Sequence, residues 1–370
     1  MKICFGLFLL GLLAAPVFSA ETPVASASLY ANTTNRGDQT STFAADKVTV
    51  DPDSQKLIKG GHAEGSNQMQ RLIQNLDRGG SALQISDIPR NTQMGNPPAP
   101  EGAPGGGKYF PPMPAHPDLP TIWLIGDSTV RNGTLGDGSN LNQWGWGAPI
   151  VAYFNLDKVN VVNRAFGGTS SRSFYTGFFW QNLRPLIKKG DYVIMQFGAN
   201  DNGGASGKGA LKGVGPETQD ITRNGKTETV HTFGWYLTQF VKETREQGAT
   251  PIICSLTPRK NWTGDNHFRR DNTTHAAWAA DVAKTTGTPF VDLYELIARK
   301  YESLGQEKVT PLYVPTPKEN LHTGWDGAVI NAECVIAGLK GLKEDPLAPY
   351  LSTRANAVAP VVIDSGEPKK

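Results

Sequence analysis

The chain has 370 residues, 38% of them hydrophobic, and its 36 Lys and Arg nearly balance its 34 Asp and Glu to give a formal net charge of +2. Because these charges are interspersed and form no basic stripe, no nucleic-acid partner is expected. Beyond the N-terminus no apolar stretch approaches the roughly 20 residues of a membrane helix, so we expect no membrane anchor in the mature chain.

The N-terminus has the three regions of a secretory signal peptide. Lys2 precedes an apolar run over residues 3–13, which is too short to span a bilayer, and small and turn-forming residues follow it. Cleavage after Ser19 places Val17 and Ser19 at the small-residue positions of the cleavage site. A buried N-terminal strand is the weaker alternative, because no polar residues alternate through the run. We therefore expect residues 1–19 to be removed and the protein to be secreted or periplasmic.

The next hundred residues have the composition of an extension and a linker. Residues 20–94 are rich in Ser, Thr, Asn, Asp and Gly, and residues 95–107 are a Pro/Gly-rich segment that cannot hold a regular element. We expect residues 20–117 to form a low-complexity extension and linker. The alternative, a small β-rich binding module, needs more alternating apolar strands than the single candidate at residues 47–50.

Residues 118–343 alternate between apolar runs and amphipathic segments, which predicts a three-layer αβα domain of the α/β class around a five-stranded parallel sheet. Each apolar run is continuous, as in strands buried on both faces. The strands are predicted near residues 121–125, 158–163, 191–197, 250–256 and 289–292, and the helices near residues 144–154, 178–188, 232–247, 274–286, 293–304 and 325–341. Residues 344–370 lack helical periodicity, so this tail either packs along the surface or is disordered.

Two cysteines remain in the mature chain, and both lie in apolar patterns. Cys254 lies in a predicted strand and Cys334 in a predicted helix, so buried free thiols are expected. A disulfide between them is the less favoured alternative in an exported protein. Because the chain has no Cys-x-x-Cys and no His-Glu-x-x-His motif, we expect no structural or catalytic zinc.

A serine follows the first predicted strand, in the segment Ile-Gly-Asp-Ser-Thr at residues 125–129. Ser128 is therefore expected at the edge of the sheet where open α/β proteins form their sites. Far along the chain, His322 has Glu319 three positions before it, so one loop can supply a base and the carboxylate that orients it. This arrangement predicts an acyl-transfer hydrolase. Gly-Asp-Ser by itself could also be an ordinary turn.

Two further segments favour the hydrolase. Residues 161–173 run from a strand into Gly167-Gly168 and on to Ser-x-Arg-Ser, and residues 192–201 run from a strand into Gly-x-Asn-Asp. With these blocks in order, and with Trp146-Gly147 between the first two, residues 119–342 resemble the SGNH (GDSL-type) hydrolase superfamily. Within it the sequence is most similar to the rhamnogalacturonan acetylesterases. The resemblance implies a flavodoxin-like sheet and a serine esterase that needs no cofactor.

The resemblance also implies roles for individual residues. Ser128 is the expected nucleophile, His322 the base and Glu319 the acid, although the family usually has Asp at that position. The oxyanion is expected to be held by the backbone N–H groups of Ser128 and Gly168 and by the Asn200 amide. Alternatives remain for two of these positions: Asn200 as a helix or turn cap, and Gly168 as a residue needed only for a positive φ. Asp201 is expected to be such a cap, and Asp127 is expected to brace the loop as a hydrogen-bond acceptor and not to belong to the triad.

The expected substrate is an acetylated polysaccharide or oligosaccharide, and the expected oligomeric state is a monomer. Trp262 lies in a polar loop and is the aromatic residue expected to stack on a sugar ring, although such residues are more often packing residues. Arg172 is a candidate partner for a uronate carboxylate, and a structural salt bridge is the alternative. The other functions considered are a lipase or thioesterase, which would need an apolar acyl channel, and a non-enzymatic carbohydrate-binding protein.

Overall fold

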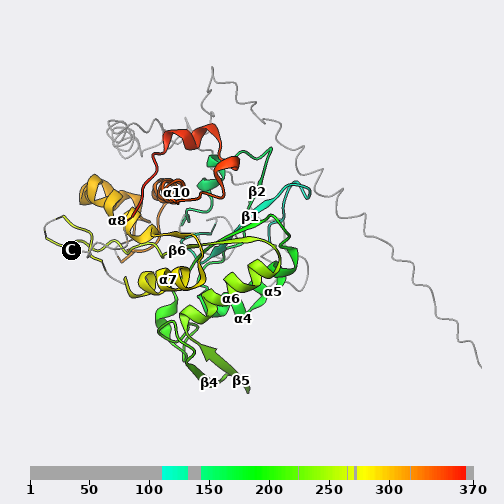
Figure 1. The fold of residues 1–370 in the computed structure, drawn as a ribbon. Helices are drawn as coiled ribbons and strands as arrows, with labels where there is room; N and C mark the ends of the chain where they lie inside the picture. Colours follow the sequence, from blue (N-terminus) through cyan, green and yellow to red (C-terminus); the bar gives the residue numbers. More distant parts are fainter. Residues whose placement is uncertain are drawn as a thin grey trace, which may run out of the picture. The chain divides into compact units, whose positions relative to one another are not determined.

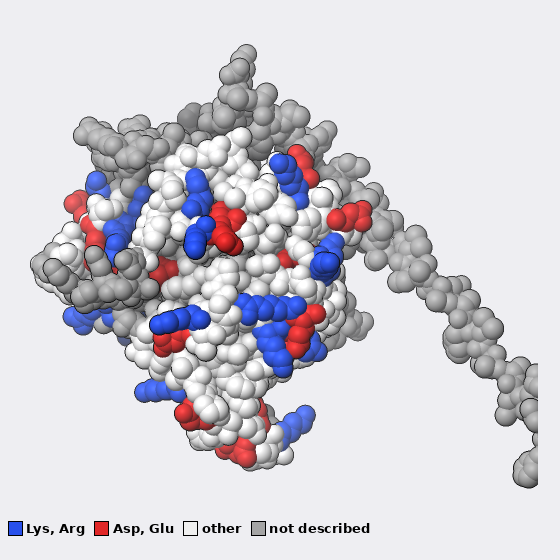
Figure 2. All heavy atoms as spheres, in the orientation of Figure 1, with Lys and Arg blue, Asp and Glu red and all other residues white. Residues whose placement is uncertain are grey.

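We analysed a computed structural model of the protein, which describes residues 111–131, 143–223, 225–264, 266–270, 273–316 and 318–363. The predicted signal peptide at residues 1–19 and the predicted extension and linker up to residue 110 lie outside the described residues. Within the described residues, no helix is both long enough and apolar enough to cross a membrane. On the face that Figure 2 presents, Lys and Arg are interspersed with Asp and Glu.

The centre of the domain is a five-stranded parallel sheet with the strand order β2-β1-β3-β6-β7. Its strands are β1 (Thr121–Gly126), β2 (Asn160–Asn163), β3 (Tyr192–Gln196), β6 (Thr250–Cys254) and β7 (Phe290–Val291). All five predicted strands are confirmed. Because the chain goes from β1 to β2 on one side and then to β3 on the other, the strand order reverses at β1. In open α/β sheets, ligands bind beyond the carboxyl ends of the strands at such a switch point.

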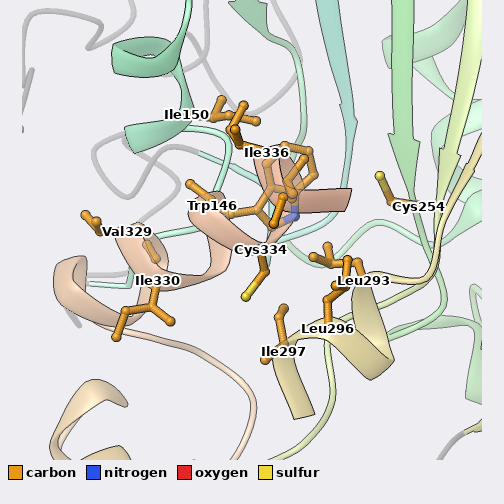
Figure 3. Packing of buried hydrophobic residues seen from close by; sticks show 14 of the residues in the cluster. Trp146, Ile150, Cys254, Leu293, Leu296, Ile297, Val329, Ile330, Cys334 and Ile336 are labelled. Carbon is orange, nitrogen blue, oxygen red and sulfur yellow. The ribbon is translucent and has the colours of Figure 1, made fainter. Parts of the chain in front are cut away.

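Alternate side chains of β1 enter two separate cores. Ile122 and Leu124 pack with η4 (Pro149–Tyr153), α8 (Leu293–Leu304) and α10 (Trp325–Lys340). Trp123 and Ile125 pack with the helices of the opposite layer, which are α4 (Ser171–Thr176), α5 (Phe178–Leu183), α6 (Phe233–Glu246) and α7 (Thr273–Thr286). The sheet therefore lies between two helical layers, as Figure 1 shows, and Figure 3 shows part of the first core around Trp146 and Cys334. The predicted three-layer fold is confirmed.

The long helices begin and end where local sequence signals place them. The Thr232 side chain accepts a hydrogen bond from the Trp235 N–H at the start of α6, and Gly248 follows this helix with a φ of 76°. The Asp292 side chain caps α8 in the same way. The predicted helix at 178–188 is divided into α5 and η5 (Arg184–Leu186), whose second residue is a proline.

Some elements were not predicted. A hairpin of β4 (Thr218–Arg223) and β5 (Lys226–His231) forms where no element was predicted, although Asn-Gly at 224–225 is the sequence signal of a two-residue hairpin turn. The predicted helix at 144–154 is wrong over its first half, since only η4 is helical. The remaining short elements are α4, α9 (Gln306–Val309), η6 (Asp201–Gly203), η7 (Thr310–Leu312), η8 (Ala348–Tyr350) and η9 (Thr353–Ala357).

The C-terminal tail packs on the domain over residues 345–363. Leu347 and Ala355 are fully buried, and the Lys340 ammonium at the end of α10 donates a hydrogen bond of 2.8 Å to the Ala355 carbonyl. Of the two possibilities for the tail, packing is therefore the one observed in this part. Cys254 and Cys334 are both buried free thiols, as predicted, and the alternative disulfide is wrong.

Candidate active site

Ser128 lies in a tight turn directly after β1. The Asp127 carboxylate accepts hydrogen bonds from the N–H and the hydroxyl of Thr129, at 2.9 and 2.8 Å. Gly126 allows the turn to pass close to β3, because a Cβ at this position would lie 2.5 Å from the carbonyl oxygen of Gln196. Asp127 therefore braces the turn, as predicted, and the turn holds Ser128 at the carboxyl edge of the sheet.

The hydroxyl oxygen of Ser128 lies 2.8 Å from Nε2 of His322, although the two residues are 194 positions apart. His322 lies in the loop before α10. This loop is held in place because the His322 carbonyl accepts a hydrogen bond of 3.1 Å from the Val314 N–H, and Thr323 forms an antiparallel bridge with Tyr313. An imidazole nitrogen at this distance can take the proton of the serine hydroxyl.

Glu319 contacts His322 with both carboxylate oxygens. Oε2 lies 3.0 Å from the ring nitrogen Nδ1, and Oε1 accepts hydrogen bonds of 2.8 Å from the backbone N–H groups of Leu321 and His322. Burial alone would raise the pKa of the Glu319 carboxyl, but the hydrogen bonds from His322 and Leu321 outweigh it and lower the pKa. An ionised carboxylate here favours the tautomer that carries its proton on Nδ1 and leaves Nε2 free to act as a base.

The three predicted oxyanion donors follow three neighbouring strands, β1, β2 and β3. Among the described residues no acceptor is recorded for the backbone N–H of Ser128 or of Gly168. Gly168 has a φ of 75°, which favours glycine. The Asn200 amide donates a hydrogen bond of 2.9 Å to the Thr169 carbonyl, and its second N–H remains for a ligand. The alternative capping role of Asn200 is wrong, because its side chain makes no capping bond to η6.

A buried hydrogen-bond network supports the turn that carries Ser128. The Trp146 indole donates to the Gln196 side-chain carbonyl at 2.8 Å, and the Gln196 amide donates to the Thr129 hydroxyl at 2.7 Å. The Trp146 N–H also donates to the Thr129 carbonyl at 3.0 Å. Residues 145–147 therefore pair with the chain after Ser128 instead of forming the predicted helix. From the sequence, Trp146 was named only as part of a motif, and no role was assigned to Gln196.

The prediction that Asp201 caps the segment after β3 is wrong. Its carboxylate accepts hydrogen bonds from the N–H of Ser171, at 3.1 and 3.2 Å, and from the Ser171 hydroxyl, at 2.6 Å. Ser171 begins α4, so Asp201 supports the start of a different helix. Burial raises the pKa of Asp201 to about 6, although the hydrogen bonds from Ser171 oppose this effect. Asp201 and Asn200 together tie the end of β3 to the segment that carries Gly168.

The structure does not support Arg172 as a substrate-binding residue. Its side chain is 3% exposed, and its guanidinium binds both oxygens of Glu228 at 2.8 and 2.6 Å. Nη1 donates to the carbonyl oxygens of Ala205 and Gly209, both at 3.0 Å. A guanidinium paired in this way is not available to a uronate carboxylate. The structural salt bridge, which was the alternative, is the arrangement observed.

Trp262 lies in a loop that is fastened to the loop of His322. The Lys260 N–H donates a hydrogen bond of 2.6 Å to the Asn320 carbonyl, which joins the two loops. The Trp262 ring is partly buried and packs edge-on against Phe268, with the ring centroids 4.7 Å apart. The ring therefore has a packing role, and its contact with substrate remains a prediction.

Together, the hydroxyl of Ser128, the imidazole of His322 and the carboxylate of Glu319 form one continuous hydrogen-bonded chain beside the N–H donors. This geometry suits nucleophilic acyl transfer, in which a serine attacks a carbonyl and nearby donors stabilise the oxyanion. Among the described residues no group of three or more His, Cys, Asp or Glu side chains is placed to hold a metal ion.

Comparisons with known proteins agree with this geometry. The model of the GDSL-like lipase/acylhydrolase family matches residues 124–315, a range that includes Ser128, Gly168 and Asn200 and ends before Glu319 and His322. A rhamnogalacturonan acetylesterase of Emericella nidulans is 32% identical over 219 residues, which are 58% of this chain and 83% of the relative. A probable rhamnogalacturonan acetylesterase of Bacillus subtilis is 30% identical over 224 residues, which are 60% of this chain and 93% of the relative.

Proposed function

Because this chain belongs to the GDSL-like lipase/acylhydrolase family, we propose that it is a secreted esterase that removes O-acetyl groups from a plant-type polysaccharide, namely a pectic rhamnogalacturonan. Family membership makes the chain an ester hydrolase. The observation that carries the proposal is the contact of 2.8 Å between the Ser128 hydroxyl and Nε2 of His322. The choice of substrate is supported by relatives that are acetylesterases acting on rhamnogalacturonan.

The reaction would begin when Ser128 attacks the carbonyl carbon of the acetyl ester and His322 takes the hydroxyl proton on Nε2. Glu319 would hold the imidazole and stabilise its positive charge. The oxyanion would be held by the N–H groups of Ser128 and Gly168 and by the Asn200 amide, each worth on the order of 3 kcal/mol of the barrier.

The tetrahedral intermediate would then collapse. His322 gives its proton to the sugar oxygen, which leaves as a free hydroxyl, and Ser128 carries the acetyl group. A water molecule next attacks the acetyl-serine while His322 takes its proton. The second collapse returns that proton to the Ser128 oxygen and releases acetate.

Acetate release from acetylated rhamnogalacturonan, xylan and chitin fragments tests this function. We expect the highest kcat/KM on rhamnogalacturonan, together with a steep fall from acetyl to octanoyl among p-nitrophenyl esters. Cleavage of p-nitrophenyl acetate without acetate release from any polysaccharide would contradict the carbohydrate substrate. Octanoyl turnover as fast as acetyl turnover would instead indicate a lipase or thioesterase.

Export can be tested separately by determining the N-terminus of the protein recovered outside the cytoplasm. We expect it to begin at Ala20. An uncut chain that stays inside the cell would contradict the proposed secretion.

A further inference from the structure

Lys208 lies beside the candidate oxyanion loop. Its Nζ donates a hydrogen bond of 2.8 Å to the carbonyl oxygen of Gly168, and a Cβ placed on Gly168 would lie 3.4 Å from the same nitrogen. Since the N–H of Gly168 is one of the proposed oxyanion donors, the ammonium is close to the position of the acetyl group during the reaction. The Lys208 side chain is exposed to solvent. A bound sugar chain can therefore reach it.

The loop that carries Lys208 is held in place by hydrogen bonds from Arg172. The Arg172 guanidinium donates to the carbonyl oxygens of Ala205 and Gly209, which lie on either side of Lys208 in the chain. In addition, the hydroxyl of Ser170 donates to the carbonyl of Lys208 itself. The backbone at Lys208 is thus fixed against α4, and a fixed backbone limits where the ammonium can lie.

Arg172 and Lys208 differ in how their positive charges are compensated. The positive charge of Arg172 is compensated inside the protein by Glu228. The recorded partner of the Lys208 ammonium is a neutral carbonyl, and among the described residues no carboxylate lies within ion-pair distance of it. An ammonium has three N–H donors, so one can stay on Gly168 while the others bind an anion. Lys208 is therefore an exposed positive charge beside the candidate oxyanion loop, with N–H donors left for an anion.

We propose that Lys208 binds the carboxylate of a uronate residue next to the acetylated sugar, and so makes the enzyme prefer acetylated, uronate-containing chains to neutral ones. This inference rests on the proposed function and assigns the charge recognition to Lys208 in place of Arg172. An ion pair at an exposed position contributes a modest free energy, which corresponds to about a fivefold effect on kcat/KM.

Two matched oligosaccharides test the proposal. One is an acetylated uronate oligosaccharide, and the other is the same oligosaccharide with its carboxylates reduced to alcohols and its acetyl groups kept. Acetate release is measured for the wild type, Lys208→Met and Lys208→Arg. Lys242→Met, which removes an exposed lysine on α6, is the matched control. The quantity compared is the ratio of kcat/KM for the charged substrate to that for the neutral one.

We expect Lys208→Met to lower this ratio about fivefold, mainly through KM, whereas Lys208→Arg keeps most of the preference. Raising the ionic strength to roughly 0.5 M should reduce the wild-type preference by screening the ion pair. An unchanged ratio in Lys208→Met, or an equal loss in Lys242→Met, would overturn the role of Lys208 while leaving the proposed function in place. If the wild type cleaves p-nitrophenyl acetate but neither oligosaccharide, the proposed function fails and this inference fails with it.

Discussion

The side chain of Glu319 holds His322 at two points. One carboxylate oxygen lies 3.0 Å from the ring nitrogen Nδ1, and the other accepts a hydrogen bond of 2.8 Å from the backbone N–H of His322. The same side chain thus fixes both the backbone of the loop and the orientation of the imidazole. The longer Glu in place of the usual Asp leaves the contact with the ring intact.

Substitution of Glu319 tests this double contact. Glu319→Gln should lower kcat by at least about 100-fold, because the amide can donate to Nδ1 and hold the wrong tautomer. Glu319→Asp should retain more activity, since it keeps a carboxylate in the same loop. Kinetics on p-nitrophenyl acetate, with thermal unfolding as the control for stability, check this. If both variants keep wild-type rates, the imidazole is oriented by another group and Ser128 and His322 act as a dyad.

His322→Ala should be about as damaging as Ser128→Ala, and the double variant should be no worse than either single one. In the proposed mechanism the hydroxyl and the imidazole act as one unit, so removing the second after the first should have little further effect. The three kcat values on p-nitrophenyl acetate decide the point. Losses that multiply in the double variant would show that the two residues act independently.

Asn200→Ala should lower kcat about 100- to 1,000-fold with a small change in KM, because the proposed hydrogen bond forms to the oxyanion and not to the ground-state ester. Asn200→Asp should be at least as damaging, since it removes the N–H donors and places a carboxylate in their position. Steady-state kinetics separate the two parameters. A rise in KM alone would mean that Asn200 binds the substrate and does not stabilise the transition state.

Sequence patterns were sufficient to place the candidate reacting groups at one edge of the sheet. Ser128, Gly168 and Asn200 each follow an apolar run of a parallel sheet, and the spacing between Glu319 and His322 brings acid and base into one loop. These relations are local, or follow from the rule that parallel strands end at the same edge.

The surroundings of the site could not be predicted, because they depend on contacts between distant segments. Arg172 follows a polar segment, and nothing local indicates its partners, which are Glu228 in an unpredicted hairpin and carbonyl oxygens beyond β3. Asp201 has the sequence context of a local cap, but its carboxylate instead accepts hydrogen bonds from Ser171, which is 30 residues away in the chain. Gln196 lies in an apolar strand, where nothing local indicates that it binds the indole of Trp146.

The free energy of unfolding should vary with pH because the carboxyl of Asp201 is buried. Burial raises the pKa of Asp201 from 3.8 to about 6, so the folded protein binds this proton more tightly than the unfolded chain does. The contribution of this group to stability is therefore present below about pH 4 and is lost as the pH rises through 6. Relative to Asp201→Asn, which keeps one acceptor for Ser171, the wild type should lose up to about 3 kcal/mol between pH 4 and pH 7.

Denaturant unfolding of both proteins at a series of pH values measures this difference. A wild type that gains stability relative to the Asn variant as the pH rises would contradict the prediction. It would show that the hydrogen bonds from Ser171 outweigh burial.

The esterase activity of Ser128→Ala is the most direct test of the account, because every step of the proposed reaction passes through this hydroxyl. We predict that kcat/KM on p-nitrophenyl acetate falls by at least about 10,000-fold while the thermal unfolding transition stays near that of the wild type, since the hydroxyl is the proposed nucleophile and contributes little to packing. A folded Ser128→Ala protein whose activity stays within about tenfold of the wild type would contradict the assignment of Ser128 and with it the proposed mechanism.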